Sequence, residues 1–179
     1  YMLTQFMLFF IMMPLIIPVT IAAYSIVGEK TTRSLEPLLA TPTTTTELLA
    51  GKCFAAAIPA VGATLLSFLI FNLGIVILGI SSKVQGYVLS PTWLVGIFLL
   101  GPVLSVISAM CAIFVSSRVN DPRVAEQITG LMIVPFMAVF LLSSFGIIEL
   151  NTRTMIVSTI VGVTLAGGLI YLGTLVFDR

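Results

Sequence analysis

The chain has 179 residues, of which 59% are hydrophobic and 8% are charged, and its mean hydropathy is +1.20. Soluble domains carry roughly 25% charged residues, so a water-soluble fold of this size could not bury so much apolar surface, and we expect lipid to be the solvent. The net charge of +1 gives no reason to propose nucleic acid as a partner, and the absence of histidine removes the commonest metal ligand and general base.

The length leaves room for about five membrane spans of ~20–25 residues with short loops, and for no separate soluble domain. We therefore expect an all-α, polytopic membrane protein in which residues 1–179 form a single transmembrane domain. The first apolar run covers about residues 2–27. Pro14 and Pro18 lie four residues apart within it, so they share one helix face, and each frees a backbone carbonyl, which predicts a kink.

Residues 28–52 form the longest polar interval of the chain. Within this interval, Glu29 to Ala40 fits a short amphipathic helix, because Leu35, Leu38 and Leu39 gather on one face at a period of 3.6 residues. We expect such a helix to lie at the membrane surface or against a partner protein.

A second span is predicted over about residues 48–80, and Thr44 and Glu47 just before it have the spacing of a capping box. Because this run is longer than a bilayer needs, its first turns are expected in the interface, where Lys52 can extend its amine toward water. Asn72 is the most polar residue deep in the run. Two interpretations stay open for it: a hydrogen bond to a neighbouring helix, or a place on a substrate path.

A short polar loop is predicted over residues 81–90, where Ser90 and Pro91 have the pattern of a helix N-cap followed by the first helical position. Trp93 is placed like an aromatic anchor at the membrane interface. The third span is predicted over about residues 93–115, with a proline inside it.

A second charged loop is predicted over residues 116–127, where Asp121 and Pro122 have the pattern of a helix N-cap followed by the first helical position. A fourth span follows at about 125–148, with Pro135 inside it, and a fifth at about 155–177. In the fifth span, Gly162 and Ala166 have small-xxx-small spacing, which favours close packing on a neighbouring helix. Three charged residues of the second loop are candidates for contact with a partner: Arg118, Asp121 and Arg123.

Lysine and arginine are divided unequally between the two ends of the predicted spans. The end that holds the two charged loops and the C-terminus has most of them: Lys30, Arg33, Lys52, Arg118, Arg123 and Arg179. The other end has Lys83 and Arg153. The positive-inside rule assigns the first end to the cytoplasm and leaves the N-terminus outside. An outside N-terminus that begins with Tyr1 leads us to expect a fragment from which an earlier span has been removed.

The interiors of the predicted spans carry no Asp, Glu, Lys, Arg or His, which proton relays and most ion-coupled carriers need. The serines in the spans have no histidine or buried lysine as a partner, which argues against a hydrolase. Gly51 and Lys52 are followed by Cys53 instead of Ser or Thr, so there is no phosphate-binding loop. We expect Cys53 and Cys111 to be small buried hydrophobic residues, the chain to hold no catalytic, cofactor or metal site, and any energy to come from another chain.

Two polar segments resemble one family of membrane proteins. The first runs from Gly28-Glu29-Lys30 through Ser34-Leu35-Glu36-Pro37-Leu38-Leu39-Ala40-Thr41-Pro42 to Glu47-Leu48-Leu49-Ala50-Gly51-Lys52, and the second is Ser117-Arg118-Val119-Asn120-Asp121-Pro122-Arg123 with Glu126-Gln127. Together with the pattern of spans, they resemble the type-2 exporter class of ATP-binding-cassette transporter permeases over nearly the whole chain. The family implies six spans and, in many members, a large external domain between the first two, so this chain looks like the last five spans.

By the same resemblance, the short amphipathic helix is a cytoplasmic coupling helix that docks on a separate nucleotide-binding ATPase subunit, which binds the ATP. Its contact residues would be Glu29, Lys30, Arg33, Leu35, Glu36, Leu38 and Leu39. The family also implies that the permease works with a second copy or a homologue in the cell membrane. Two alternatives stay open: an ATP-independent channel or carrier, and a membrane scaffold that transports nothing.

Overall fold

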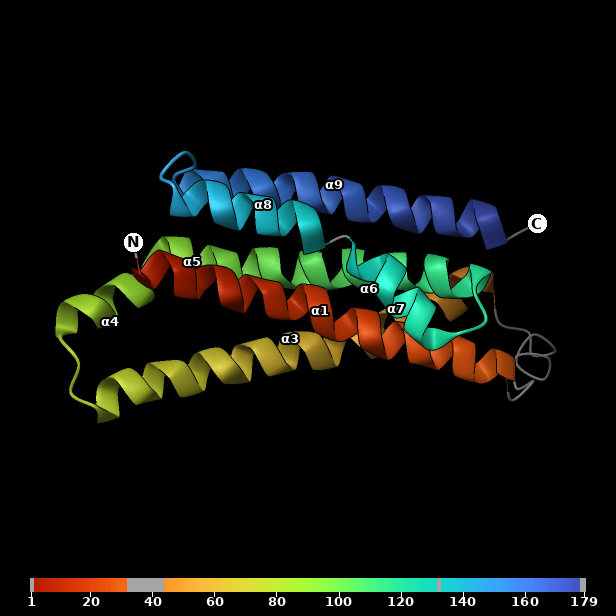
Figure 1. Cartoon of the computed structure of the whole chain (residues 1–179), viewed down its shortest axis with the longest axis horizontal. Helices are drawn as coiled ribbons and strands as arrows, with labels where there is room; N and C mark the ends of the chain where they lie inside the picture. Colours follow the sequence, from red (N-terminus) through yellow and green to blue (C-terminus); the bar gives the residue numbers. More distant parts are fainter. Residues whose placement is uncertain (1, 32–43, 132, 178–179) are drawn as a thin grey trace.

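The computed structural model of the chain describes residues 2–31, 44–131 and 133–177 (Figure 1). Every regular element in these ranges is a helix. Five helical segments are long and apolar enough to cross a membrane. The prediction of an all-α, polytopic membrane protein with about five spans is therefore confirmed.

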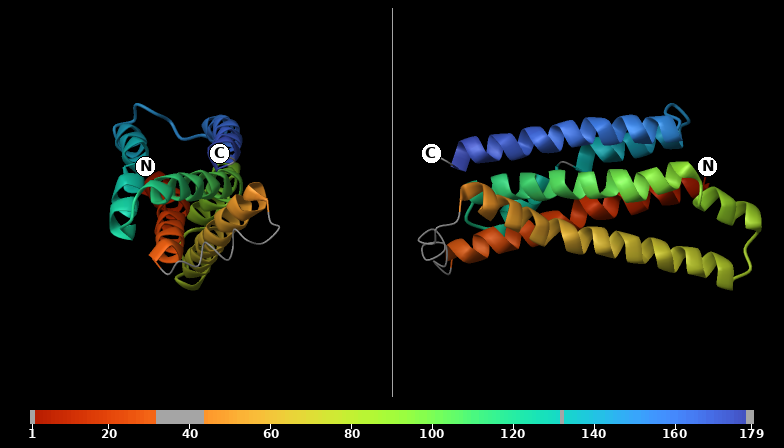
Figure 2. Two further views of the ribbon diagram at one scale, coloured as in Figure 1. Left: turned by 90° about the vertical axis from the view of Figure 1, so that its right-hand side faces the viewer. Right: turned by 180° about the vertical axis from the view of Figure 1, so that it is seen from behind.

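The described helices follow one another in this order: α1 (Met2–Thr31), α3 (Thr45–Ile77), α4 (Ser82–Val88), α5 (Pro91–Val95), the π-helix η1 (Gly96–Leu100), α6 (Gly101–Arg118), α7 (Pro122–Gly130), α8 (Ile133–Ser144) and α9 (Thr152–Phe177). The most extensive packing is between α1 and α6, α3 packs against both, and α9 packs against α6. Figure 2 shows α8 and α9 as two separate helices on one side of this group. As five spans require, α1 begins at one end of the bundle and α9 ends at the other (Figure 1).

Pro14 and Pro18 both lie inside α1, which continues past the predicted boundary to Thr31. Pro18 has no N–H, so the carbonyl of Pro14 lacks its usual partner one turn further along the helix. The hydroxyl of Ser108 on α6 lies 3.1 Å from this carbonyl and donates to it, with the carbonyl of Ser105 in its own helix as a second acceptor at 3.2 Å. Both prolines are fully buried, so a neighbouring helix supplies the donor that lipid could not.

The start of α3 has the predicted capping box. The hydroxyl of Thr44 accepts from the backbone N–H of Glu47 at 3.3 Å, and the carboxylate of Glu47 accepts from the N–H of Thr44 at 2.9 Å. Asn72, further along α3, donates from Nδ2 to the carbonyl of Phe68 in the same helix at 2.8 Å. The interpretation that Asn72 bonds a neighbouring helix is therefore wrong, because its amide bonds the carbonyl one turn earlier in its own helix. A place for Asn72 on a substrate path stays a prediction.

Residues 81–90 are mainly helical, so the prediction of a polar loop here is wrong. The helix α4 begins after Ser81, whose hydroxyl accepts from the N–H of Lys83. Val88, near the end of α4, is fully buried in the main hydrophobic cluster. The apolar contact of Val88 with distant helices therefore stabilises α4, although the polar composition of residues 81–90 is typical of a loop.

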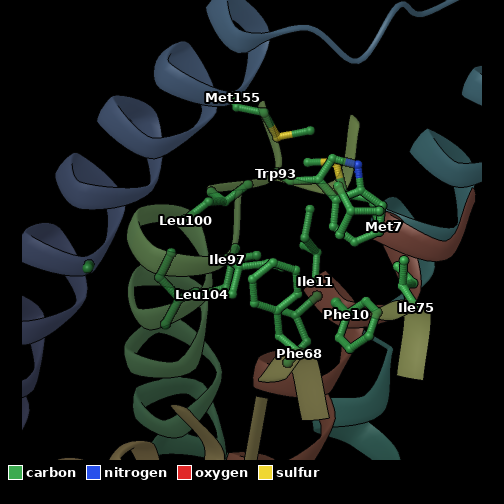
Figure 3. Packing of buried hydrophobic residues seen from close by; sticks show 14 residues of the cluster. Met7, Phe10, Ile11, Phe68, Ile75, Trp93, Ile97, Leu100, Leu104 and Met155 are labelled. Carbon is green, nitrogen blue, oxygen red and sulfur yellow. The ribbon is translucent and has the colours of Figure 1, made fainter. Parts of the chain in front are cut away.

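Trp93 lies inside the bundle, and the prediction that it anchors the chain at the interface is wrong. Its side chain is fully buried, and its ring centroid lies 6.0 Å from that of Phe10 and 6.1 Å from those of Phe68 and Phe71. Figure 3 shows the rings of Trp93, Phe10 and Phe68 gathered with aliphatic side chains around them. Because these rings come from α1 and α3, aromatic packing between helices outweighs the preference of tryptophan for the interface.

The third span changes helix type where it approaches its proline. In η1, the N–H of Gly101 bonds to the carbonyl of Gly96, which is the wider spacing of a π-helix. Pro102 follows directly, and a proline ring clashes with the carbonyl four residues before it, here that of Phe98. A wider turn just ahead of the proline makes room for its ring, and such π-bulges are frequent at functional sites.

The predicted fourth span is found as one apolar candidate span over Pro122–Ser143, with Pro135 inside it, and its described residues form two helices. The first helix, α7, ends at Gly130, a residue that disfavours helix. Pro135 lies in the first turn of α8, where a backbone N–H has no partner to lose. Gly130 at the end of α7 and Pro135 near the start of α8 therefore mark the ends of the two helices. The helix α7 packs on α1 and α6, and α8 contacts α1.

The predicted close packing of the fifth span is confirmed. Gly162 and Ala166 are both buried, and a Cβ atom at Gly162 would lie only 2.8 Å from Cγ1 of Val103 on α6. The same face carries Gly173, where a Cβ atom would lie 3.3 Å from the side chains of Met110 and Phe114. Small residues on this face of α9 thus let its backbone approach α6 closely.

Candidate functional site at the charged end of the bundle

One end of the bundle brings together most of the charged residues that the structure describes. At this end α1, α6 and α9 finish and α3 and α7 begin (Figure 1). The described residues of the two polar segments, 28–31 and 44–52 of the first and 116–127 of the second, therefore lie at the same end although they are far apart along the chain. We call this region the charged end.

Glu29 and Lys52 form an ion pair across the charged end, between Oε2 of the carboxylate and Nζ of the amine. The side chain of Lys52 is 14% exposed and that of Glu29 is 29% exposed. The prediction that Lys52 extends into water is therefore wrong, because a carboxylate on the neighbouring helix is close enough to pair with it. The pair ties the last turn of α1 to the second turn of α3.

The position of Glu29 explains why a lysine is needed beside it. Glu29 lies in the last turn of α1, where the unpaired carbonyls form the negative end of the helix dipole. A carboxylate is unfavourable there unless a cation is near. Lys52 supplies that cation, so the pair offsets the unfavourable charge at the end of α1.

Of the seven predicted contact residues of the coupling helix, Glu29 and Lys30 belong to the end of α1. The rest lie outside the described residues: Arg33, Leu35, Glu36, Leu38 and Leu39. The predicted helix over Glu29 to Ala40 is thus observed only in its first residues, which continue α1 without a break. Its remainder, and its role in contacting a partner, stay predictions.

The second charged segment is more helical than predicted. Arg118 is the last residue of α6 and is exposed. Asp121 is the N-cap of α7, as predicted, and its carboxylate accepts from the backbone N–H of Arg123 at 2.8 Å. The side chain of Arg123 is exposed. Only residues 119–121 separate the two helices, so these three charged residues are held close to the charged end.

One polar contact, between Thr20 and Glu126, was not predicted from the sequence. The hydroxyl of Thr20 on α1 donates to Oε1 of Glu126 on α7 at 2.6 Å. Thr20 precedes Glu29 by roughly 14 Å of helix, at a rise of about 1.5 Å per residue. Glu126, in the second turn of α7, therefore contacts the apolar part of α1.

The amphipathic pattern of α7 explains how a carboxylate reaches this position. Ala125 and Thr129 are one turn apart and fully buried, while Arg123 and Gln127 are exposed. The buried face of α7 packs on α1 and α6, and Glu126 lies beside that face. The spacing of Ala125 and Thr129 is visible in the sequence, and it would have indicated the helix if this segment had not been assigned to a loop.

The charged end offers ion pairs and hydrogen bonds to the helices that meet there. Within the described residues, no three His, Cys, Asp or Glu side chains are close enough to hold a metal ion. Both cysteines are free thiols in the described structure, Cys53 buried and Cys111 half-buried. The arrangement suits the recognition of a charged protein surface and a mechanical link between α1, α3 and α7.

Comparison with curated proteins and with solved structures gives no match. A family model described as ABC-2 family transporter protein matches residues 1–171, which include the first four apolar spans, most of the fifth and both segments of the charged end. This family consists of the membrane permease components of ATP-binding-cassette transporters. The chain belongs to the ABC-2 transporter family, as a multi-pass membrane permease.

Proposed function

We propose that this permease is the transmembrane subunit of an ATP-driven exporter and that its charged end docks on a separate nucleotide-binding ATPase subunit. ATP binds to that subunit, and this chain contributes no ATPase site. The segment from Glu29 to Ala40 is the coupling helix. The permease functions as a dimer with a second copy or a homologue, and the substrate path forms between them.

The Glu29–Lys52 ion pair is the observation that best supports this proposal. The ion pair joins the end of α1 to the start of α3, on either side of the polar interval. A force applied to the segment between Glu29 and Lys52 would therefore act on both helices. These two helices have 30 and 33 residues and pack on each other and on α6. A displacement at the charged end is therefore carried along most of the bundle.

The charges of the second segment support a further contact with the same partner. Arg118 and Arg123 are both exposed at the charged end, next to the N-cap Asp121. Exposed arginines pair well with carboxylates on a partner because the guanidinium group donates in a fixed fork. Arg118, Asp121 and Arg123 thus form a second docking point beside the coupling helix.

The distribution of positive charge supports a cytoplasmic position for the charged end. Lys52, Arg118 and Arg123 lie there, whereas Lys83 and Arg153 lie at the other end. By the positive-inside rule, the N-terminus of this chain is outside and the C-terminus is cytoplasmic. A soluble ATPase subunit can reach the charged end only in this orientation.

A charge exchange at the ion pair tests the proposal in the full-length permease purified with its ATPase. Glu29→Lys and Lys52→Glu each place like charges together, and we expect either to lower the ATPase rate of the complex toward that of the free ATPase subunit. The double exchange restores an attractive pair and should recover the rate. Equal rates in all four proteins would contradict a role for this pair in coupling.

A second variant addresses the predicted coupling helix itself. Glu36→Lys is expected to uncouple ATP hydrolysis from transport while leaving the spans folded, because it reverses a charge within the proposed coupling helix. Circular dichroism checks that the helical content is unchanged. Coupled transport that is unaltered in this variant would contradict a role for Glu36 in coupling.

A further inference from the structure

An apolar cavity of about 450 Å³ lies between α1, α6, α8 and α9, away from the charged end's ion pair. This volume falls within the roughly 300–1,000 Å³ that is usual for small-molecule sites. Four of the lining residues are labelled in Figure 3: Ile11, Leu100, Leu104 and Met155. Among the lining residues, Ser158 alone has a polar side chain.

This lining favours hydrocarbon over water as the content of the cavity. A water molecule in a protein interior needs two to four polar partners, and apolar cavities of this kind stay dry. Ser158 is the single polar side chain that lines the cavity, so a water molecule there would lack the partners it needs. The cost of leaving a cavity empty grows with its volume, so an apolar filling stabilises the fold.

The cavity is open on one side, along α8 and α9. Three lining residues of α9 are about half exposed: Val157 at 53%, Val161 at 51% and Leu165 at 57%. Val139 of α8 also lines the cavity and is 36% exposed. The end view in Figure 2 shows α8 and α9 standing apart above α1. Because both helices belong to apolar spans, the opening faces the interior of the bilayer.

We propose that this cavity binds a single acyl chain of a membrane lipid, which enters sideways from the bilayer between α8 and α9. The acyl chain fills the cavity between α8 on one side and α6 and α9 on the other, where the described helices leave the cavity open. The lipid headgroup is not recognised, since no charged side chain lines the cavity. The inference concerns a structural lipid and does not depend on coupling to an ATPase.

Filling the cavity from its exposed rim tests this proposal. The variant combines Ser158→Phe and Val161→Phe, because both residues line the opening and are exposed. Ile160→Phe is the matched control: it lies on α9, is 59% exposed and does not line the cavity. The full-length protein is purified in detergent, stripped of loosely bound lipid, and analysed for retained lipid by mass spectrometry and for its melting temperature.

The probe is palmitoyl lysophosphatidylcholine, and glycerophosphocholine supplies the same headgroup without a chain. We expect the unmodified protein and Ile160→Phe to retain lipid and to melt at a higher temperature with the lysolipid but not with glycerophosphocholine. The double variant should lose both the retained lipid and the shift. Equal retention and equal shifts in all three proteins, or an equal effect of glycerophosphocholine, would overturn the proposal.

Two further measurements keep the test decisive. Light scattering of the double variant follows its oligomeric state, and dissociation of a dimer with unchanged lipid retention would assign the cavity to a second copy of the chain and overturn the proposal. If the double variant does not fold, the unmodified protein is tested with octanoyl, dodecanoyl and palmitoyl lysolipids. The melting temperature should then rise with chain length, and a shift independent of chain length would contradict an acyl-chain site.

Discussion

The hydroxyl of Ser108 on α6 donates to the carbonyl of Pro14 on α1 at 3.1 Å, and this carbonyl is the one that Pro18 leaves without a backbone donor. Ser108 is buried, so no solvent can replace its hydroxyl. The bond makes the interior of α1 depend on α6, its most extensive packing partner.

Replacing the hydroxyl should destabilise the bundle. We expect Ser108→Ala to lower the free energy of unfolding by about 1 kcal/mol, because a buried acceptor loses its donor. Ser105→Ala is the matched control, since Ser105 is equally buried on α6 but bonds the carbonyl of Pro102 in its own helix. Unfolding in mixed micelles measures both, and an equal loss in the two variants would argue against a special role of the bond between helices.

A second prediction concerns the close approach of α9 to α6. Gly162→Ala places a methyl group 2.8 Å from Cγ1 of Val103, a branched side chain that cannot easily turn away. We expect a loss of about 1–3 kcal/mol in unfolding free energy. Gly167→Ala on the same helix meets nothing within 4 Å, so its better helix propensity should stabilise by up to about 1 kcal/mol. The same sign of change in both variants would contradict the observed packing.

A third prediction concerns the contact between Thr20 and Glu126. Thr20→Val keeps the shape of the side chain but removes the donor of the 2.6 Å bond, and we expect a loss of about 1–2 kcal/mol because the acceptor is ionic and half-buried. Hydrogen exchange should become faster in α7, which packs on α1 and α6. Thr164→Val, which removes a bond within α9, should leave exchange in α7 unchanged. Unchanged exchange in Thr20→Val would show that packing alone holds α7.

The features that the sequence predicts correctly are local ones. Five apolar spans follow from hydropathy and length. The caps at Thr44 and Asp121 follow from residues within three positions of each other. The packing of Gly162 also follows from short spacing, because small residues one turn apart are useful mainly against another helix.

The features that the sequence does not predict depend on neighbours far along the chain. Trp93 is buried because aromatic rings from α1 and α3 surround it. Those rings belong to residues that are distant from Trp93 in the sequence, so the residues next to Trp93 do not reveal them. Lys52 pairs with Glu29 instead of extending to water because α1 ends beside α3. Glu126 contacts an apolar span because α7 packs back against Thr20 of α1. In each case the partner, and not the residue's own preference, decides the outcome.

Co-purification from mild detergent with the full-length permease tests whether an ATPase subunit docks on the charged end. Mass spectrometry identifies the soluble proteins that bind the unmodified protein, a variant with residues 29–36 scrambled, and a control with residues 145–151 scrambled at the opposite end. We expect an ATPase to be recovered with the unmodified protein and the control and to be lost with the first variant. Recovery of no ATPase in several detergents, or equal recovery with all three proteins, would contradict this docking.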